Sequence, residues 1–197
     1  MIKIGLTGNI ASGKSLVEDF LLEMDVPVVD ADKIVHDLYS EKSFADKISA
    51  LFEGEDIFEN GKLSRAKIGK IVFNDKNKMK KLEEILHPEV INRINIFFEE
   101  NKDRDIAVAS VPLLFEENLE KLFDCIVTVF VDNVNQINRL IKRNNLTKDE
   151  AMSRINSQMS IDEKAKKSDF IINNSGTPDG TKEQLVIVLN QIKEGVG

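Results

Sequence analysis

The sequence predicts an α/β fold in which helices cover both faces of a five-stranded parallel sheet. Short apolar segments alternate with longer helical patterns along the chain, as they do in parallel α/β proteins. The segment 126–131 is apolar almost throughout, which is typical of a strand covered on both faces. We expect the strands at about 2–7, 26–30, 106–111, 125–131 and 169–172.

The first strand leads directly into a phosphate-binding motif, since residues 8–15 match G-x-x-x-x-G-K-[ST] at every required position. Glycines let backbone N–H groups face phosphate oxygens, and the helix expected at about 14–24 adds the positive end of its dipole. Lys14 should bridge the β- and γ-phosphates, and the Ser15 hydroxyl should bind Mg²⁺. We therefore expect ATP to contact Gly8, Asn9, Ile10, Ala11, Ser12, Gly13, Lys14, Ser15 and Leu16.

Two aspartates, Asp30 and Asp32, follow the second strand, where a helix begins. Ligands of open parallel sheets lie beyond the carboxyl ends of the strands, so both carboxylates should reach the same edge as the phosphate loop. One of them could accept the proton of a hydroxyl that is being phosphorylated. The alternative is that one aspartate only caps the helix.

Two long insertions separate the expected strands. Residues 31–104 look wholly helical and form a candidate acceptor-binding domain, and residues 133–167 form a candidate helical lid. The nucleotide-binding core would then consist of residues 1–30, 105–132 and 168–197. This organisation is that of a three-layer P-loop kinase fold.

The candidate lid carries Gln136, Arg139 and Arg143 on one helix face. An arginine that closes onto the γ-phosphate would stabilise the transferred group, although a solvated charged face is the alternative. After the last strand, the polar turn that contains Asn174 could line the adenine pocket or be a simple loop.

Composition limits the class of protein. The net charge of −7 argues against non-specific binding to nucleic acid or anionic membranes. No apolar run approaches the roughly 20 residues of a membrane span. The single Cys125 excludes an internal disulfide and is expected to be a small core residue. We expect a cytoplasmic protein, and the sequence leaves its oligomeric state open.

Several segments together resemble dephospho-coenzyme A kinases over nearly the whole chain. The most specific are Asp30-Ala31-Asp32 and Pro112-Leu113-Leu114-Phe115-Glu116. The other segments that carry the resemblance are Gly5 to Ser15, His36, Gly61 to Arg65, Val72-Phe73, Leu86-His87-Pro88, Gln136, Arg139, Arg143, Gln158 and Asp169 to Asn174.

The resemblance implies transfer of a phosphoryl group from ATP to the ribose 3′-hydroxyl of dephospho-coenzyme A, giving coenzyme A and ADP. Asp32 matches the family's general base and Arg143 its lid arginine, while His36, Arg65 and His87 are candidate acceptor-binding residues. Each of the last three also has a structural interpretation: partial burial, an ion pair with an acid, and a position beside a helix-kinking proline. The sequence departs from the family pattern at Asn9 and Ala11, where glycine is usual, at Leu16, where Thr is usual, and at Ser110, where Asp is frequent.

Two other functions fit the phosphate loop. The chain could be another small P-loop kinase, or a nucleotide-dependent switch that transfers no phosphate to a small molecule. A GTPase would need an Asn-Lys-x-Asp motif, which is absent, and a switch should keep an acidic residue on the strand that ends at Ser110. Acceptor-dependent release of ADP distinguishes the three.

Overall fold

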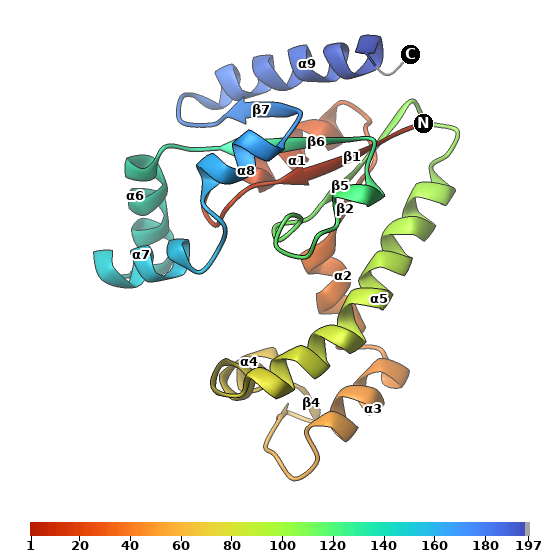
Figure 1. Ribbon diagram of the computed structural model, residues 1–197, viewed down its shortest axis with the longest axis vertical. Coiled ribbons are helices and arrows are strands. Elements are labelled where there is room, and N and C mark those ends of the chain that lie inside the picture. The colour runs from red at the N-terminus through yellow and green to blue at the C-terminus, as the bar shows by residue number, and fades with distance from the viewer. Residues whose placement is uncertain (196–197) are drawn as a thin grey trace. The chain divides into compact units, whose positions relative to one another are not determined.

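The computed structural model describes residues 1–195, and its chain forms two compact units (Figure 1). The first unit contains residues 1–30 and the chain from residue 98 onward, and the second contains residues 31–97.

The first unit is built on a five-stranded parallel sheet, as expected. Its strands are β1 (Ile2–Thr7), β2 (Val28–Asp30), β5 (Ile106–Ser110), β6 (Cys125–Phe130) and β7 (Phe170–Asn173), in the spatial order β2-β5-β1-β6-β7. Strand β2 is shorter than the predicted 26–30. It is preceded by Pro27, which has no N–H to donate to a neighbouring strand, although its carbonyl accepts from the Val108 N–H at 2.9 Å.

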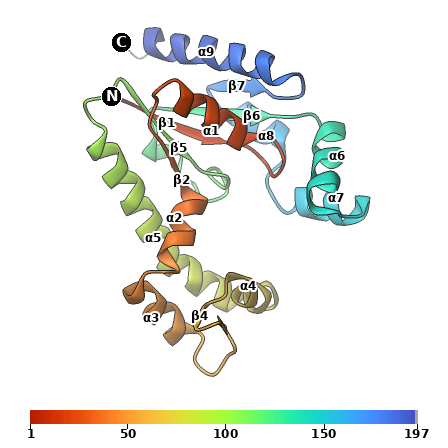
Figure 2. The same ribbon diagram turned by 180° about the vertical axis from the view of Figure 1, so that it is seen from behind.

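Helices lie on both faces of this sheet (Figures 1 and 2). Helices α1 (Lys14–Glu23) and α9 (Pro178–Gly195) pack together on one face, and α8 (Ile161–Lys167) contacts β6 on the other. The main core contains side chains from the strands, α1 and α9, among them Leu6, Val17, Val129, Leu185 and Ile192. The three-layer arrangement is therefore confirmed.

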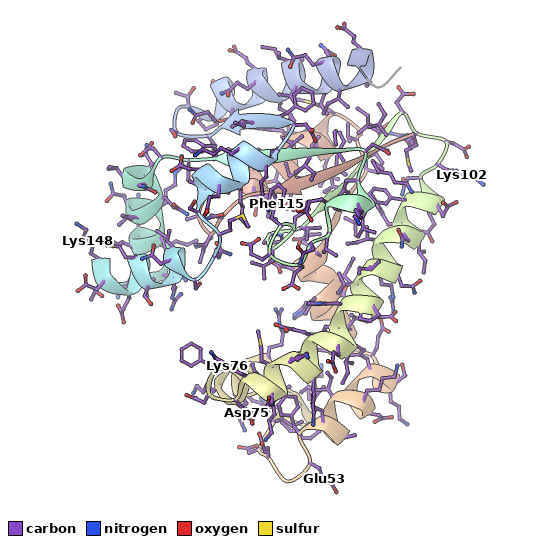
Figure 3. All side chains as sticks on the ribbon, viewed as in Figure 1. Glu53, Asp75, Lys76, Lys102, Phe115 and Lys148 are labelled. Carbon is purple, nitrogen blue, oxygen red and sulfur yellow. The ribbon has the colours of Figure 1, made fainter. Side chains whose placement is uncertain are left out.

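The second face of the sheet is closed by the segment between β5 and β6. Gly5 makes room for it, since a Cβ at this position would lie 2.7 Å from Leu114 Cδ1 and 2.8 Å from Phe123 Cδ2. Phe115 of the same segment is buried, whereas Lys102 and Lys148 are exposed (Figure 3). A short 3₁₀ helix, η1 (Glu120–Leu122), precedes β6.

Helices α6 (Asn133–Asn144) and α7 (Lys148–Asn156) complete the region between β6 and β7. Asp132 caps α6, and its pKa is lowered chiefly by the hydrogen bond from the Asn135 backbone N–H. Thr147 and Ser160 each form a capping box at the start of α7 and α8. Residues 133–167 therefore form three capped helices.

The second unit is mainly helical, with α2 (Ala31–Leu38), α3 (Lys42–Leu51), α4 (Arg65–Asn74) and most of α5 (Lys76–Glu100). The prediction of a wholly helical insertion was wrong in one place, because β3 (Phe58–Glu59) and β4 (Lys62–Leu63) form an antiparallel hairpin. Asn60 and Gly61 join these strands with φ of 51° and 76°. Two left-handed residues in sequence are typical of a type I′ hairpin turn, for which Asn-Gly is the preferred pair.

Cys125 lies in the core of the first unit, as expected. Burial, with smaller effects of the Asp169 and Asp124 carboxylates, raises the pKa of its thiol to about 12. Across residues 1–195, no helix combines the length and the apolar character needed to cross a bilayer.

Candidate active site

The phosphate loop connects β1 to α1 and is packed tightly against its neighbours. Gly13 has a φ of 90° and precedes the first residue of α1. A Cβ on Gly13 would overlap Asn174 Nδ2, and a Cβ on Gly8 would lie 2.8 Å from the Val129 carbonyl oxygen. Both glycines are therefore required by close packing as well as by the motif.

Ala11 adopts a left-handed conformation within this loop, with a φ of 62°. Ser12 donates its backbone N–H to the Asn9 carbonyl at 3.0 Å, which closes the turn around Ala11. The loop thus keeps a conformation that favours glycine although an alanine occupies the position.

Lys14 lies in a largely buried polar cluster. Its ammonium is 2.8 Å from Glu18 Oε1 and 2.5 Å from Ser110 Oγ, and the Ser110 hydroxyl also donates to Glu18. Ser110 is fully buried and Glu18 is only 7% exposed. Sequence reasoning noted that Ser110 replaces an acid but missed Glu18, because a lysine and a glutamate four residues apart are typical of exposed helix surfaces.

The two predicted aspartates occupy different elements. Asp30 ends β2 and pairs with Ser110 in the parallel register, so it lies at the same edge of the sheet as the phosphate loop. Asp32 is exposed in the first turn of α2, where a carboxylate interacts favourably with the helix dipole. The helix begins at Ala31, between the two aspartates, as expected.

The predicted face of α6 reaches the phosphate loop through two of its three residues. Gln136 is fully buried, and its side-chain amide donates to the Ile10 carbonyl at 2.9 Å. Arg139 donates to the Ser12 carbonyl of the loop at 3.5 Å and to the Asn174 carbonyl at 2.7 Å. Arg143, one turn further on, is exposed and donates to the side chain of Asn144.

Asn174 supports the loop from the side of β7. Its amide donates to the Ser12 carbonyl at 2.7 Å, and its own side-chain oxygen accepts from the Thr181 hydroxyl at 2.9 Å. The side chain is 3% exposed and is thus committed to holding the loop. An adenine contact by this residue stays a prediction.

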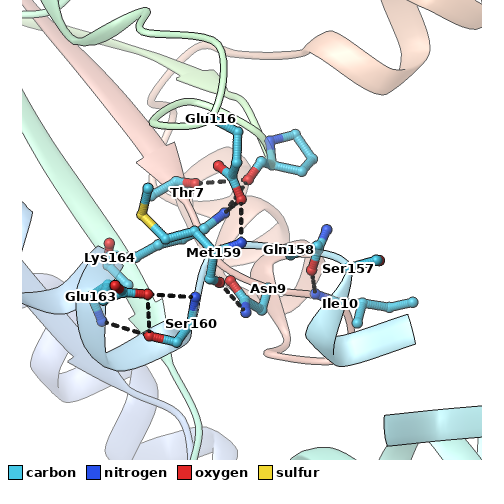
Figure 4. Close-up of polar contacts among 12 residues, drawn as sticks. Thr7, Asn9, Ile10, Glu116, Ser157, Gln158, Met159, Ser160, Glu163 and Lys164 are labelled. Atoms are coloured by element: carbon cyan, nitrogen blue, oxygen red, sulfur yellow. Dashed lines mark hydrogen bonds and ion pairs between the residues drawn. The ribbon is translucent and has the colours of Figure 1, made fainter. Parts of the chain in front are cut away.

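A second group of hydrogen bonds joins the loop to the segment between α7 and α8 (Figure 4). Asn9 Nδ2 donates to the Met159 carbonyl and the Ile10 N–H donates to Gln158 Oε1, both at 2.8 Å. Glu116 Oε1 in turn accepts the Met159 N–H at 3.0 Å. The Gln158–Met159 segment is therefore fixed between the phosphate loop and Glu116.

Lys164 completes this arrangement from α8. Its side chain is fully buried, and its ammonium lies 2.9 Å from Glu116 Oε1 and 2.6 Å from the Pro112 carbonyl. Burial lowers the pKa of Lys164, and the Glu116 carboxylate opposes that effect. The Pro-Leu-Leu-Phe-Glu segment thus has a structural function that the sequence did not indicate.

The candidate acceptor residues of the second unit differ in their surroundings. His36 of α2 is exposed and His87 of α5 is half-buried. Arg65, which starts α4, lies over the Tyr39 ring with 5.9 Å between the guanidinium carbon and the ring centroid. Burial raises the pKa of Tyr39 and the Arg65 charge opposes this. The role of each residue in binding an acceptor stays a prediction.

Residues 2–179 match the family model described as dephospho-CoA kinase. The chain belongs to the dephospho-CoA kinase family. Among related proteins named dephospho-CoA kinase, that of Listeria innocua is 42% identical over 193 residues, covering 95% of this chain and 96% of the relative. That of Bacillus cereus is 42% identical over 195 residues, covering 96% of each.

Several solved structures are similar to this chain. The dephospho-CoA kinase of Campylobacter jejuni superposes with a TM-score of 0.73 at 28% identity, covering 99% of this chain and 98% of that one. TT1252 from Thermus thermophilus gives a TM-score of 0.86 at 28% identity, covering 97% of each chain. A shikimate kinase from Aquifex aeolicus, at 14% identity and a TM-score of 0.51, covers 97% of this chain and 98% of its own, and shares the fold alone.

Proposed function

We propose that this chain transfers the γ-phosphoryl group of ATP to the ribose 3′-hydroxyl of dephospho-coenzyme A, giving coenzyme A and ADP. The observation that carries the proposal is a complete phosphate loop in a chain that aligns with dephospho-CoA kinases over 95% of its length. This is the last step of coenzyme A biosynthesis. We infer that it takes place in the cytoplasm.

The transfer itself requires positioning and charge stabilisation more than covalent chemistry. A bond forms between the ribose 3′-oxygen and the γ-phosphorus while the bond from that phosphorus to the β–γ bridging oxygen breaks, and ADP leaves. The hydroxyl proton passes to the Asp32 carboxylate. Lys14 neutralises charge on the β- and γ-phosphates, and Arg143 is proposed to add a second positive charge from the lid.

The residues near the loop fit the Mg²⁺ that kinases use with ATP. Ser15, exposed at the start of α1, offers a hydroxyl oxygen, and hard oxygen donors are what Mg²⁺ prefers. When bound with the nucleotide, Mg²⁺ neutralises developing charge on the phosphate oxygens. Ser15 is therefore proposed to hold it.

Acceptor recognition is assigned to the second unit, with His36, Arg65 and His87 as the proposed contacts. Arg65 provides a permanent positive charge, and guanidinium groups are well suited to phosphate oxygens. ATP and dephospho-coenzyme A are the proposed partners. Neither nucleic acid nor a membrane is proposed as a partner.

The sharpest test of the proposal is Asp32→Asn, which keeps the shape of the side chain but removes most of its basicity. Formation of coenzyme A should fall by about 10²–10⁴, the usual contribution of a positioned base. ATP affinity, measured by calorimetry, should change little because the phosphates are held by the loop.

Asp37→Asn is the matched control, since Asp37 is exposed on the same helix. It should leave turnover near that of the unmodified enzyme. Retained turnover in Asp32→Asn would make Asp32 a structural residue, and a simultaneous loss of ATP affinity would assign it to the metal instead.

A further inference from the structure

We propose that Glu18 is the acidic group with which this chain receives the divalent cation of the nucleotide, and that it holds Lys14 until the nucleotide arrives. The inference deepens the proposed function and rests on it. It assigns one residue to two successive partners: the Lys14 ammonium before binding, and a hydrated cation afterwards.

The contacts of Glu18 are those of a built site. One carboxylate oxygen, Oε1, accepts from the Lys14 ammonium at 2.8 Å and from the Ser110 hydroxyl. Ser110 also lies 2.5 Å from Lys14 Nζ, so the three side chains contact one another in a closed triangle. The residues come from two elements, the first turns of α1 and the end of β5.

Burial distinguishes this pair from an ordinary ion pair on a helix surface. The side chains of Lys14 and Glu18 are 13% and 9% exposed, and Ser110 is completely buried. An exposed lysine–glutamate pair contributes little, whereas a buried carboxylate is costly to leave without a counter-charge. A buried carboxylate beside the central lysine of the phosphate loop therefore calls for a function beyond stability.

The position of Glu18 suits a cation that arrives with phosphates. Glu18 follows Ser15 by three residues on α1, so the two side chains share one face of the helix. Ser15, Glu18 and Ser110 offer only oxygen donors, the set that Mg²⁺ prefers. Mg²⁺ usually keeps several waters and is bound by one or two protein groups together with substrate phosphates.

P-loop proteins commonly hold Mg²⁺ with an aspartate on a strand beside the loop, and β5 of this chain, which pairs with β1, ends with Ser110 instead. The Ser110 hydroxyl donates to Glu18. The carboxylate of Glu18, from α1, therefore lies beside the position on β5 where such an aspartate would stand.

Nucleotide binding then becomes an exchange of partners. For Lys14 to reach the β- and γ-phosphates, it must leave Glu18, which places a buried carboxylate near several phosphate charges. Such like charges repel strongly in a partly buried site. A divalent cation that enters with the nucleotide offsets this repulsion between the Glu18 carboxylate and the phosphates. Through Glu18, ATP binding therefore depends on the cation.

The test is ATP binding by calorimetry, with the metal removed by EDTA and again with saturating Mg²⁺. In EDTA, Glu18→Gln should bind ATP at least about threefold more tightly, because Lys14 is released and one negative charge is removed. The gain in affinity on adding Mg²⁺ should be smaller than in the unmodified protein by about tenfold or more. Asp19→Asn is the matched control, since Asp19 is the exposed neighbour on the same helix, and its Mg²⁺ gain should be unchanged.

A second variant moves the carboxylate without removing it. Glu18→Ser combined with Ser110→Asp should recover most of the Mg²⁺ gain that Glu18→Gln loses. An undiminished gain in Glu18→Gln would overturn the proposal. If Glu18→Gln does not fold, the exchange variant decides alone, and a folded exchange variant without an Mg²⁺ gain would overturn it too. Absence of ATP binding by the unmodified chain would instead overturn the proposed function.

Discussion

At the scale of the residue, the phosphate loop contains a strained position at Ala11, which the sequence analysis noted only as a departure from glycine. Ala11 has a φ of 62°, a conformation that costs an L-residue about 1–2 kcal/mol and glycine almost nothing. The family pattern usually has glycine at this position, and the backbone of this chain has the left-handed conformation that favours glycine. The loop therefore tolerates the strain because neighbouring hydrogen bonds hold it.

Ala11→Gly should stabilise the protein, since it removes this strain but adds chain entropy worth about 0.5–1 kcal/mol to the unfolded state. We expect a net increase of about 0.5–1 kcal/mol in the free energy of unfolding, measured in urea without nucleotide. Ala165→Gly, inside helix α8 of the same unit, should instead lower it by about the same amount. Equal destabilisation by both substitutions would show that Ala11 is not strained.

The sequence predicted the residues of the phosphate loop well, but it did not predict the buried charged residues near it, Glu18 and Lys164. The motif located Lys14 and Ser15 because it prescribes both the residue types and their spacing. Glu18 and Lys164 have no such motif, and charged residues on helices are usually exposed. Their burial depends on Ser110 and Glu116, which lie far from them along the chain, so only the fold reveals it.

At the scale of the element, Glu116 connects three parts of the first unit. It accepts the Met159 N–H, it pairs with Lys164 of α8, and Met159 in turn accepts from Asn9 of the phosphate loop. Glu116 and the phosphate loop are thus both hydrogen-bonded to the segment between α7 and α8. A substitution of Glu116 should therefore change both the stability of the protein and the position of the phosphate loop.

Glu116→Gln should destabilise the protein at neutral pH by about 3 kcal/mol, because it leaves the buried Lys164 ammonium without its counter-charge. Burial already places the pKa of Lys164 below its usual value, and loss of Glu116 lowers it further. Between that pKa and the unfolded value near 10.5, the unfolded chain binds more protons, so stability rises with pH. The deficit of the variant should shrink as the pH approaches 10.

Glu163→Gln is the control for this pH profile. Glu163 is exposed on α8, and hydrogen bonds from Ser160 lower its pKa. Its contribution is therefore lost as the pH falls through the acid range, and the alkaline profile should match that of the unmodified protein. Urea unfolding from pH 6 to 10 measures the free energy of unfolding of both variants. A loss of stability in Glu116→Gln that stays constant up to pH 10 would contradict a charged Lys164.

Helices and strands were predictable where the apolar residues followed a single repeat, either a continuous apolar segment or helical spacing. The five strands and α1 follow from apolar segments and helical spacing, and their ends moved by at most two residues. The hairpin of β3 and β4 was missed because its strands have two residues each and so show no alternation. Its signal was the turn, Asn60-Gly61, of which only Gly61 was noted, as part of the resemblance.

At the scale of the whole molecule, two compact units correspond to two classes of ligand under the proposed function. The first unit holds the phosphate loop, the contacts of α6, and the segment between α7 and α8. The second holds Asp32 and the candidate acceptor residues. The boundary between the units at residues 97 and 98 lies within α5, near its end. The sequence placed it at residue 104, because the insertion should end where the next expected strand, at about 106–111, begins.

The last prediction tests this division of ligands with backbone hydrogen exchange in three states: without ligand, with ATP and Mg²⁺, and with dephospho-coenzyme A alone. ATP should slow exchange at residues 8–15, and also at 158–160, because Asn9 and Ile10 are hydrogen-bonded to that segment. Dephospho-coenzyme A should slow exchange mainly within residues 31–97. The hairpin at 58–63 in the second unit and helix α9 in the first serve as internal references, since ATP should leave their exchange unchanged. Protection by the acceptor confined to the first unit would contradict an acceptor-binding insertion. Protection by ATP at 8–15 without any at 158–160 would show that the segment between α7 and α8 is not coupled to the loop.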